Sequence, residues 1–245
     1  TATIAIMGPD VRWVGTETGY GRETEWSVVP ANNLNIASIT EGSQKNLAFK
    51  PQGDMTGSDL GSRDKIINAK GLVWYPAETD VSIRPGWFYH EEENDKVKTP
   101  EKLLDIYFNS VGRNGVLLLN IPPDKEGLIN DSDIAALKKW KQLRYNIFKK
   151  NFAKNAILES SNGINAGLIL DNNDATHFTT TGNDTTAIIE IQLKTKATFN
   201  VLQLQENIRM GQRIEKFALE YWDGKAWIMA AQGTSIGFKR LLKFS

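Results

Sequence analysis

The sequence predicts an α/β fold followed by an all-β fold. Apolar runs suited to buried strands alternate with helical patterns through about residue 152, and from residue 153 onward apolar and polar residues alternate with a period of two. Buried strands that alternate with helices indicate a parallel sheet, whereas period-two strands joined by short turns indicate an antiparallel β-sandwich. We therefore expect two domains, residues 1–152 and residues 153–245.

Three apolar runs are the candidate strands of the first domain. The clearest is Val116–Ile121, and shorter ones are Thr3–Met7 and Gly71–Tyr75. Residues 28–70 are rich in Asn, Gly, Ser, Lys and Asp and show weak periodicity. We expect them to form a long loop, and loops of that length usually signal function or disorder.

Two helices are predicted to accompany these strands. Thr99 offers a hydroxyl cap, Pro100 takes the first helical position, and Glu101 places an acid in the first turn. Asp131 or Ser132 is expected to cap the second helix. The apolar positions of the first helix are Leu103, Leu104, Ile106, Tyr107 and Val111, and those of the second are Ile134, Leu137, Trp140, Leu143 and Ile147.

The second domain shows the pattern of antiparallel strands. Apolar residues alternate with polar ones across residues 189–193, 202–205 and 217–221. Asp223-Gly224 follows the last of these runs and is a dipeptide favoured in two-residue hairpin turns.

Composition excludes several classes of function. Lys plus Arg and Asp plus Glu both number 29, so no net basic surface is available for nucleic acid or an anionic membrane. The sequence contains no run of about 18 apolar residues, so no membrane-spanning helix is expected. The absence of cysteine removes disulfides and thiolate chemistry. His90 and His177 are the two histidines, too few and too far apart for a strong zinc site, so we expect no catalytic metal and no cofactor.

Two segments gather the residue types that bind a sugar. Residues 8–17 and 76–90 each combine carboxylates, an arginine and tryptophan. An indole face packs against the apolar face of a pyranose, arginine orders hydroxyl groups, and a carboxyl group moves a proton at the glycosidic oxygen. Tryptophan more often fills a core than stacks on a ligand, but four of them cluster near these segments: Trp13, Trp26, Trp74 and Trp87.

Glu17 is the leading candidate for the proton-transferring carboxyl group, and Glu23 and Glu25 are its rivals. All three lie in a loop-like stretch just past Trp13, where a glutamate is more often simply solvated.

Glu78 and Asp80 follow the predicted strand at residues 71–75 directly, which is where parallel sheets place their sites. Their structural alternative is an ion pair with Arg84.

Three motifs resemble the α-L-fucosidases of glycoside hydrolase family 29. They are GPDVRWVG at residues 8–15, PAETDVSIRPGWFYH at residues 76–90 and LLDIYFNSVGRNGVLLLNIPPDKEGLI at residues 103–129. The resemblance covers roughly residues 3–150 and is greater to the branch acting on α-1,3/1,4 linkages than to the broad-specificity branch. It implies the C-terminal portion of a (β/α) TIM-like barrel followed by a β-sandwich.

The resemblance also implies a retaining mechanism, in which an aspartate nucleophile and a glutamate acid/base lie roughly 5 Å apart. The glutamate after the first motif falls at Glu17. Arg12 and Trp87 fall at positions that contact fucose in the family, and Trp13 and Glu78 are weaker candidates for contact with a neighbouring sugar. The family's nucleophile belongs to a Trp-Phe-Asp-Gly type of motif, which this sequence does not contain.

Residues 168–178, LILDNNDATHF, are similar to discoidin-like (galactose-binding-like) modules. Such modules often bind sugars and sometimes bind calcium through carbonyls and aspartates, so a structural calcium ion is an expectation here. We expect the chain to stop short of the module's last strand. The family resemblance implies a periplasmic or extracellular location, and no signal peptide is visible in this chain.

We therefore expect a retaining glycoside hydrolase that releases terminal α-L-fucose from fucosylated oligosaccharides. This chain would supply the acid/base side of the site but not the nucleophile, so alone it should be inactive. One alternative is a carbohydrate-binding protein without catalysis, built on a decayed barrel. Another is a glycosidase of the same mechanism acting on a different sugar, such as a galactoside. The sequence does not indicate an oligomeric state.

Overall fold

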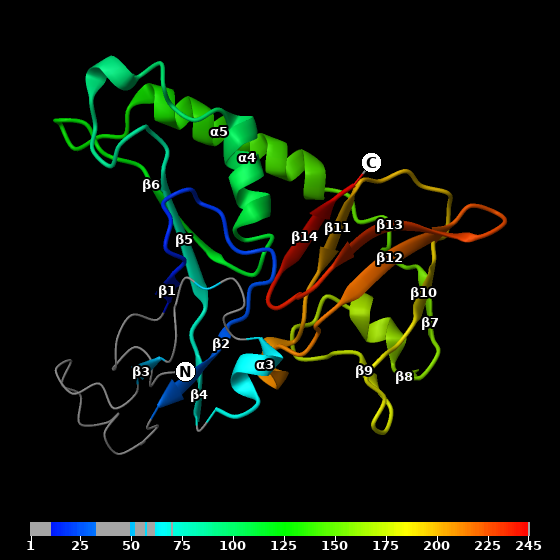
Figure 1. Cartoon of the computed structure of the whole chain (residues 1–245). Coiled ribbons are helices and arrows are strands. Elements are labelled where there is room, and N and C mark those ends of the chain that lie inside the picture. Colours follow the sequence, from blue (N-terminus) through cyan, green and yellow to red (C-terminus); the bar gives the residue numbers. More distant parts are fainter. Residues whose placement is uncertain (1–10, 33–49, 52–56, 58–61, 70, 245) are drawn as a thin grey trace.

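The first part of the molecule combines small sheets with two long helices, and the second part is built from paired strands (Figure 1). The computed structural model describes residues 11–32, 50–51, 57, 62–69 and 71–244. The strand predicted at Thr3–Met7 lies outside these residues. The pattern changes after Phe148, where the last long helix ends, and the division into two domains near residue 152 stays a prediction.

A three-stranded parallel sheet with the order β1–β5–β6 lies at the centre of the first part (Figure 1). Its strands are β1 (Arg12–Trp13), β5 (Ala77–Ser82) and β6 (Val116–Asn120). Trp13 pairs with Glu78, and Ser82 pairs with Asn120. The predicted parallel sheet is therefore confirmed, and all three strands end at the same edge.

Two helices cover one face of this sheet: α4 (Pro100–Asn109) and α5 (Asp131–Phe148) (Figure 1). Ile83, just after β5, is buried in one cluster with Leu103 of α4 and Ala136 of α5. The Thr99 side chain accepts a hydrogen bond from the Lys102 backbone N–H, as the sequence predicted for α4. The apolar helix faces therefore pack on the sheet, where burial of their side chains stabilises the fold.

The cap of α5 differs from the prediction. Asn130, rather than Asp131 or Ser132, has extended backbone, and its Oδ1 accepts a hydrogen bond of 3.0 Å from the Ser132 backbone N–H. Asp131 is already helical. An asparagine at this position satisfies one of the unpaired N–H groups of the first turn, which is why the helix begins one residue after it.

The prediction of a long loop over residues 28–70 is wrong at its start. Residues Val28–Asn32 form β2, which pairs antiparallel with β4 (Gly71–Trp74) and with β3 (Lys50–Pro51). A short helix, α3, spans Arg63–Ile66. The strand predicted near residues 71–75 is therefore real, but it belongs to this antiparallel sheet and not to the parallel one.

The strand β5 belongs to the parallel sheet, but the sequence analysis did not predict it. Its residues alternate, with Ala77, Thr79 and Val81 buried and Glu78 and Asp80 half-buried. This period-two pattern does not resemble the continuous apolar run that a parallel strand usually shows. Glu78 and Asp80 consequently lie within a strand, whereas we expected them to follow one.

Antiparallel pairs make up the described strands of the second part. They are β7 (Ile157–Ser160) with β10 (Ile189–Gln192), β8 (Gly163–Ile164) with β9 (Thr179–Thr180), β11 (Val201–Leu204) with β14 (Arg240–Lys243), and β12 (Phe217–Trp222) with β13 (Trp227–Gly233). Three short 3₁₀ helices also occur in the described part of the chain: η1 (Glu91–Glu93), η2 (Ala166–Leu170) and η3 (Ile208–Met210). The predicted antiparallel pairing is confirmed, and Asp223-Gly224 begins the β12–β13 turn, in which the Asp223 backbone N–H donates to the Ala226 carbonyl.

The loop after β1 is held against the sheet at Gly19. The Gly19 backbone N–H donates to the Asp80 carbonyl over 3.0 Å, and Gly19 has a φ of 77°. A Cβ atom there would lie 2.8 Å from Ile106 Cγ2 and 2.9 Å from Val81 Cγ1. The backbone conformation and the close packing both require glycine at this point.

We expect Gly19→Ala to destabilise the fold more than Gly127→Ala does. Gly127 has nearly the same φ, 79°, but a Cβ atom there would meet nothing within 4 Å. The two variants share the cost of a positive φ, so the difference isolates overpacking, about 1–3 kcal/mol. Denaturant unfolding of both variants measures it. Equal losses would contradict the close packing of this loop.

Candidate functional site

The candidate site lies where the three parallel strands end. Glu17 follows β1, Trp87 follows β5, and Asn120 is the last residue of β6. Trp87 Nε1 donates a hydrogen bond of 2.8 Å to Glu17 Oε2. Asn120 Nδ2 donates to the Trp87 carbonyl over 3.0 Å and to Ser82 Oγ over 3.0 Å. The structure thus joins Glu17 and Trp87, which the sequence proposed from two separate motifs, at the edge where parallel sheets place their ligands.

A second aromatic side chain lies on the sheet face opposite the helices. Trp13 is 49% exposed, and its Nε1 donates a hydrogen bond of 2.6 Å to Asp80 Oδ1. Glu78 is the register partner of Trp13, so these side chains share that face. An exposed indole beside two carboxylates offers both an apolar surface and hydrogen-bond acceptors, the two features that a sugar ring can engage.

Arg84 has a structural role different from the expected one. It is fully buried, and its guanidinium donates to Asp133 Oδ2 over 2.8 and 3.1 Å, to Asn94 Oδ1 over 2.9 Å and to the His90 carbonyl over 3.2 Å. The ion pair of Arg84 with Glu78 or Asp80, which the sequence offered as the structural alternative, is therefore wrong. Arg84 instead ties the segment after β5, which carries Trp87, to the first turn of α5.

Glu25 is buried between two arginines. Its side chain is 0% exposed, and its carboxylate accepts hydrogen bonds from Arg12 Nη2 and, over 3.0 Å, from Arg22 Nη1. Arg22 Nη2 also reaches the Val14 carbonyl over 3.5 Å. This ion triad closes the base of the loop that contains Glu17, because Arg12 precedes that glutamate and Arg22 follows it.

Arg12 lies within this triad and is 2% exposed. Besides Glu25, it donates to the Tyr75 carbonyl over 3.1 Å and to the Trp26 carbonyl over 2.8 Å. Burial lowers the pKa of the Arg12 guanidinium, and the charge of Glu25 opposes that shift. The sequence placed Arg12 in contact with a sugar, whereas the structure places its side chain in the interior.

Glu23 occupies a third environment. It is 58% exposed at its side chain and pairs with Arg113 over 2.8 Å and with Arg240 of β14. Among the three glutamates proposed for proton transfer, Glu25 is enclosed by guanidinium groups and Glu23 is bound at the junction with the second part. Glu17 is also exposed, and it meets Trp87 at the strand ends.

A polar cluster that the sequence did not single out fixes the far side of the Glu17 loop. Tyr20 Oη donates to Asp105 Oδ2 over 2.5 Å, and Lys102 Nζ donates to Tyr20 Oη and, over 3.2 Å, to Asp105. The hydrogen bond to Tyr20 is the main cause that raises the pKa of Lys102. The pKa of Asp105 is lowered, because the bonds from Tyr20 and Lys102 outweigh its desolvation. Tyr20 and Asp105 lie 85 residues apart in the chain, so their contact gives no signal in the sequence.

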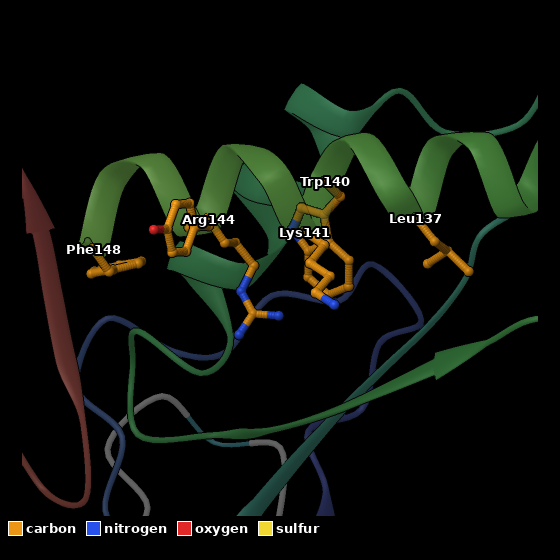
Figure 2. A pocket seen from close by; sticks show the side chains of 6 residues that line it. Leu137, Trp140, Lys141, Arg144 and Phe148 are labelled. Carbon is orange, nitrogen blue, oxygen red and sulfur yellow. The ribbon is translucent and has the colours of Figure 1, made fainter.

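A hollow of about 490 Å³ lies elsewhere, along α5 (Figure 2). All of its lining residues belong to that helix: Leu137, Trp140, Lys141, Arg144, Tyr145 and Phe148. The Arg144 guanidinium stacks over the rings of Tyr107 and Trp140 at 4.3 and 5.0 Å. No candidate site residue lines this hollow, so we do not assign the site to it.

Within the described ranges, no three or more His, Cys, Asp or Glu side chains gather as a metal site would require. Asp171, in the segment for which calcium was expected, accepts hydrogen bonds from the Asn173 backbone N–H and from Thr176 Oγ1. None of the described helices combines the length and apolar character needed to cross a membrane.

We compared the sequence and structure of the chain with those of known proteins. The family model for alpha-L-fucosidase matches residues 9–143, which contain Glu17, Trp87 and Asn120. The chain belongs to the alpha-L-fucosidase family, glycoside hydrolase family 29. Alpha-L-fucosidase 1 of Arabidopsis thaliana is 37% identical over 97% of this chain and 44% of its own length. A relative from Oryza sativa subsp. japonica is 38% identical over 97% of this chain and 43% of its own length.

Solved structures agree. The Ruminococcus gnavus family 29 fucosidase in complex with fucose matches with a TM-score of 0.78 and 29% identity, covering 96% of this chain and 45% of that one. A Bacteroides ovatus crystal structure matches with a TM-score of 0.72 and 41% identity, covering 98% and 37%. The chain therefore spans less than half the length of these relatives.

We expect Glu25→Gln to be strongly destabilising. The variant leaves the buried guanidinium of Arg12 and the partly buried one of Arg22 facing a neutral amide, and breaking a buried ion pair costs about 3–5 kcal/mol. The matched control is Asp105→Asn, which breaks a pair whose side chains are 48% and 47% exposed and should cost under about 1 kcal/mol. Denaturant unfolding compares the two, and a similar small loss in both would contradict the role assigned to the triad.

The Tyr20–Asp105 contact should make stability depend on acid pH. Since the folded pKa of Asp105 lies below its unfolded value, the contact stabilises the fold above the unfolded pKa of about 3.9, and this contribution is lost as pH falls through the folded pKa. We expect the stability difference between the wild type and Tyr20→Phe to shrink between about pH 7 and about pH 3. Thermal unfolding across that range measures it; a difference that grows on acidification would refute the assignment.

Proposed function

We propose that the protein containing this chain is a retaining α-L-fucosidase in which Glu17 is the general acid and then the general base. The observation that carries the proposal is the Glu17–Trp87 hydrogen bond at the ends of β1 and β5. A carboxyl group that donates and recovers a proton must be reachable by the glycosidic oxygen, and Glu17 is exposed at this edge. Family membership supports fucose as the sugar.

The remaining roles follow from where the side chains lie. Trp87 orients the Glu17 carboxyl group through its indole N–H and borders the fucose. Trp13 and Glu78, together on the open face of the sheet, contact the neighbouring sugar. Arg12 acts by holding β1 in place rather than by touching substrate, because its guanidinium is enclosed by Glu25 and backbone carbonyls.

The reaction then needs a second carboxyl group. In a retaining enzyme the nucleophile attacks the anomeric carbon while the acid protonates the leaving oxygen, and water later releases the sugar with the same residue acting as base. We propose that the nucleophile is the aspartate of a Trp-Phe-Asp-Gly type of motif, which this sequence does not contain.

The proposal includes the architecture that the sequence motifs suggested. The parallel sheet and its helices would be part of a (β/α) barrel, and the paired strands of residues 153–245 would belong to a discoidin-like β-sandwich. Substrates with α-1,3 or α-1,4 linkages and a periplasmic or extracellular location belong to the same proposal. It involves neither a metal nor a cofactor in the reaction.

Glu17→Gln in the complete protein should lower kcat/KM for a phenyl α-L-fucoside by about 10²–10⁴-fold, because the poor leaving group needs a proton. A dinitrophenyl α-L-fucoside needs no proton and should lose far less in its first step. Azide should restore turnover of the activated substrate by replacing the water that Glu17 activates.

Glu23→Gln is the control variant. A wild-type rate in Glu17→Gln, or an equal loss of rate in Glu23→Gln, would contradict the assignment of Glu17 as the acid/base group. If the protein hydrolysed aryl galactosides but not aryl fucosides, the proposal that fucose is the substrate sugar would be wrong.

A further inference from the structure

The second part of the chain holds the segment Glu23–Ser27 in place through several buried hydrogen bonds. Gln212 lies just after η3 and is 8% exposed. Its Nε2 donates to the Glu25 carbonyl over 2.9 Å, and its Oε1 accepts from the Ser27 backbone N–H over 2.9 Å. One amide side chain therefore satisfies a backbone acceptor and a backbone donor on both sides of Trp26.

Asn114 reinforces the same contact from the turn before β6. Its Nδ2 donates to the Glu25 carbonyl over 3.1 Å and to Gln212 Oε1 over 3.2 Å, while its Oδ1 accepts from the Phe238 backbone N–H over 2.7 Å. Ser235 Oγ accepts from the Glu25 backbone N–H over 3.2 Å. The backbone of Glu25 is thus fixed from three directions.

The rim of this contact is also polar and paired. Thr24 Oγ1 lies 2.6 Å from Thr234 Oγ1. Arg240, which is 1% exposed, donates to the Glu23 carbonyl over 2.6 Å and pairs with the Glu23 carboxylate. Buried polar groups of this kind fix one geometry, because a displaced partner leaves an unsatisfied group in the interior.

We propose that Gln212 is a positioning residue for the acid/base group, so that the second part of the chain sets the geometry of the Glu17 loop. This inference rests on the proposed function. The physical connection has three steps: Gln212 holds the Glu25 backbone, the Glu25 carboxylate holds Arg12 and Arg22, and these two arginines hold both ends of the Glu17 loop.

The proposal makes a prediction about chemistry that a merely stabilising contact would not. A displaced acid/base group slows reactions that need its proton, whereas partial unfolding lowers the rates of all substrates equally. Misplacement of about 1 Å is enough to cost catalysis by up to about 10²-fold. The leaving-group dependence of the rate therefore separates the two roles.

The test compares Gln212→Met with Gln203→Met in the complete protein. Methionine keeps the volume and removes the hydrogen bonds, and Gln203 is an exposed glutamine on β11 in the same part of the chain. For Gln212→Met we expect kcat/KM, which reports the first step, to fall about tenfold more for the phenyl α-L-fucoside than for the dinitrophenyl α-L-fucoside, with circular dichroism unchanged. Gln203→Met should keep the wild-type ratio. An equal fall for both substrates, or no fall, would overturn the proposal.

A second measurement does not depend on fucosidase activity. In the 245-residue chain, the Arg12 and Val14 backbone N–H groups donate to the Pro76 and Glu78 carbonyls. We expect Gln212→Met to speed hydrogen exchange of these two amides at least about threefold while leaving the β12–β13 amides unchanged. Unchanged exchange at Arg12 and Val14 would overturn the coupling. If the wild type hydrolyses no fucoside but this exchange responds, the proposed function fails and the positioning of the loop stands.

Discussion

The buried carboxylate of Glu25 between two arginines is the interaction on which the candidate site depends. A lone charge at this depth would be too costly to remain ionised, so the glutamate and its partners must be assembled together. Because Arg12 lies in β1 and Arg22 lies beyond Glu17, a single carboxylate links both ends of the intervening loop. Glu17 can therefore be exposed to solvent while both ends of its loop stay fixed.

The two faces of the parallel sheet differ: one packs against the helices and the other carries Trp13 and its neighbouring carboxylates. On β5, Thr79 and Val81 are buried on the side of α4 and α5, whereas Glu78 and Asp80 lie on the side that carries Trp13. Since side chains alternate along a strand, a few residues can support the helix packing and the candidate site at once. The site residues proper come after the strands, where the backbone is free to direct them, and Asn120 links two of these segments across the sheet edge.

Sequence reasoning succeeded where structure depends on local chemistry. The Thr99 cap, the apolar run that became β6 and the Asp223-Gly224 turn each depend on groups a few residues apart. The motifs also proposed Glu17 and Trp87, because both fall in segments where carboxylates and indoles are concentrated, and the structure joins these two side chains by a hydrogen bond. The strand β5 was missed because its polar face interrupts the expected apolar run. The contacts of Arg12 and Gln212 could not be predicted, since Arg12 meets Glu25 within the fold and Gln212 meets Ser27 across 185 residues of sequence.

Three glutamates within nine residues show why position, not residue type, decides chemistry. Glu25 accepts hydrogen bonds from two guanidinium groups and has no exposed surface, so it cannot exchange a proton with a bound sugar. Glu23 has an exposed side chain but is held by Arg113 and Arg240 at the junction between the two parts of the chain. Glu17 meets the neutral indole N–H of Trp87 at the strand ends. An indole can orient a carboxyl group in either protonation state, whereas a guanidinium favours the ionised one, and an acid that later serves as base needs both states.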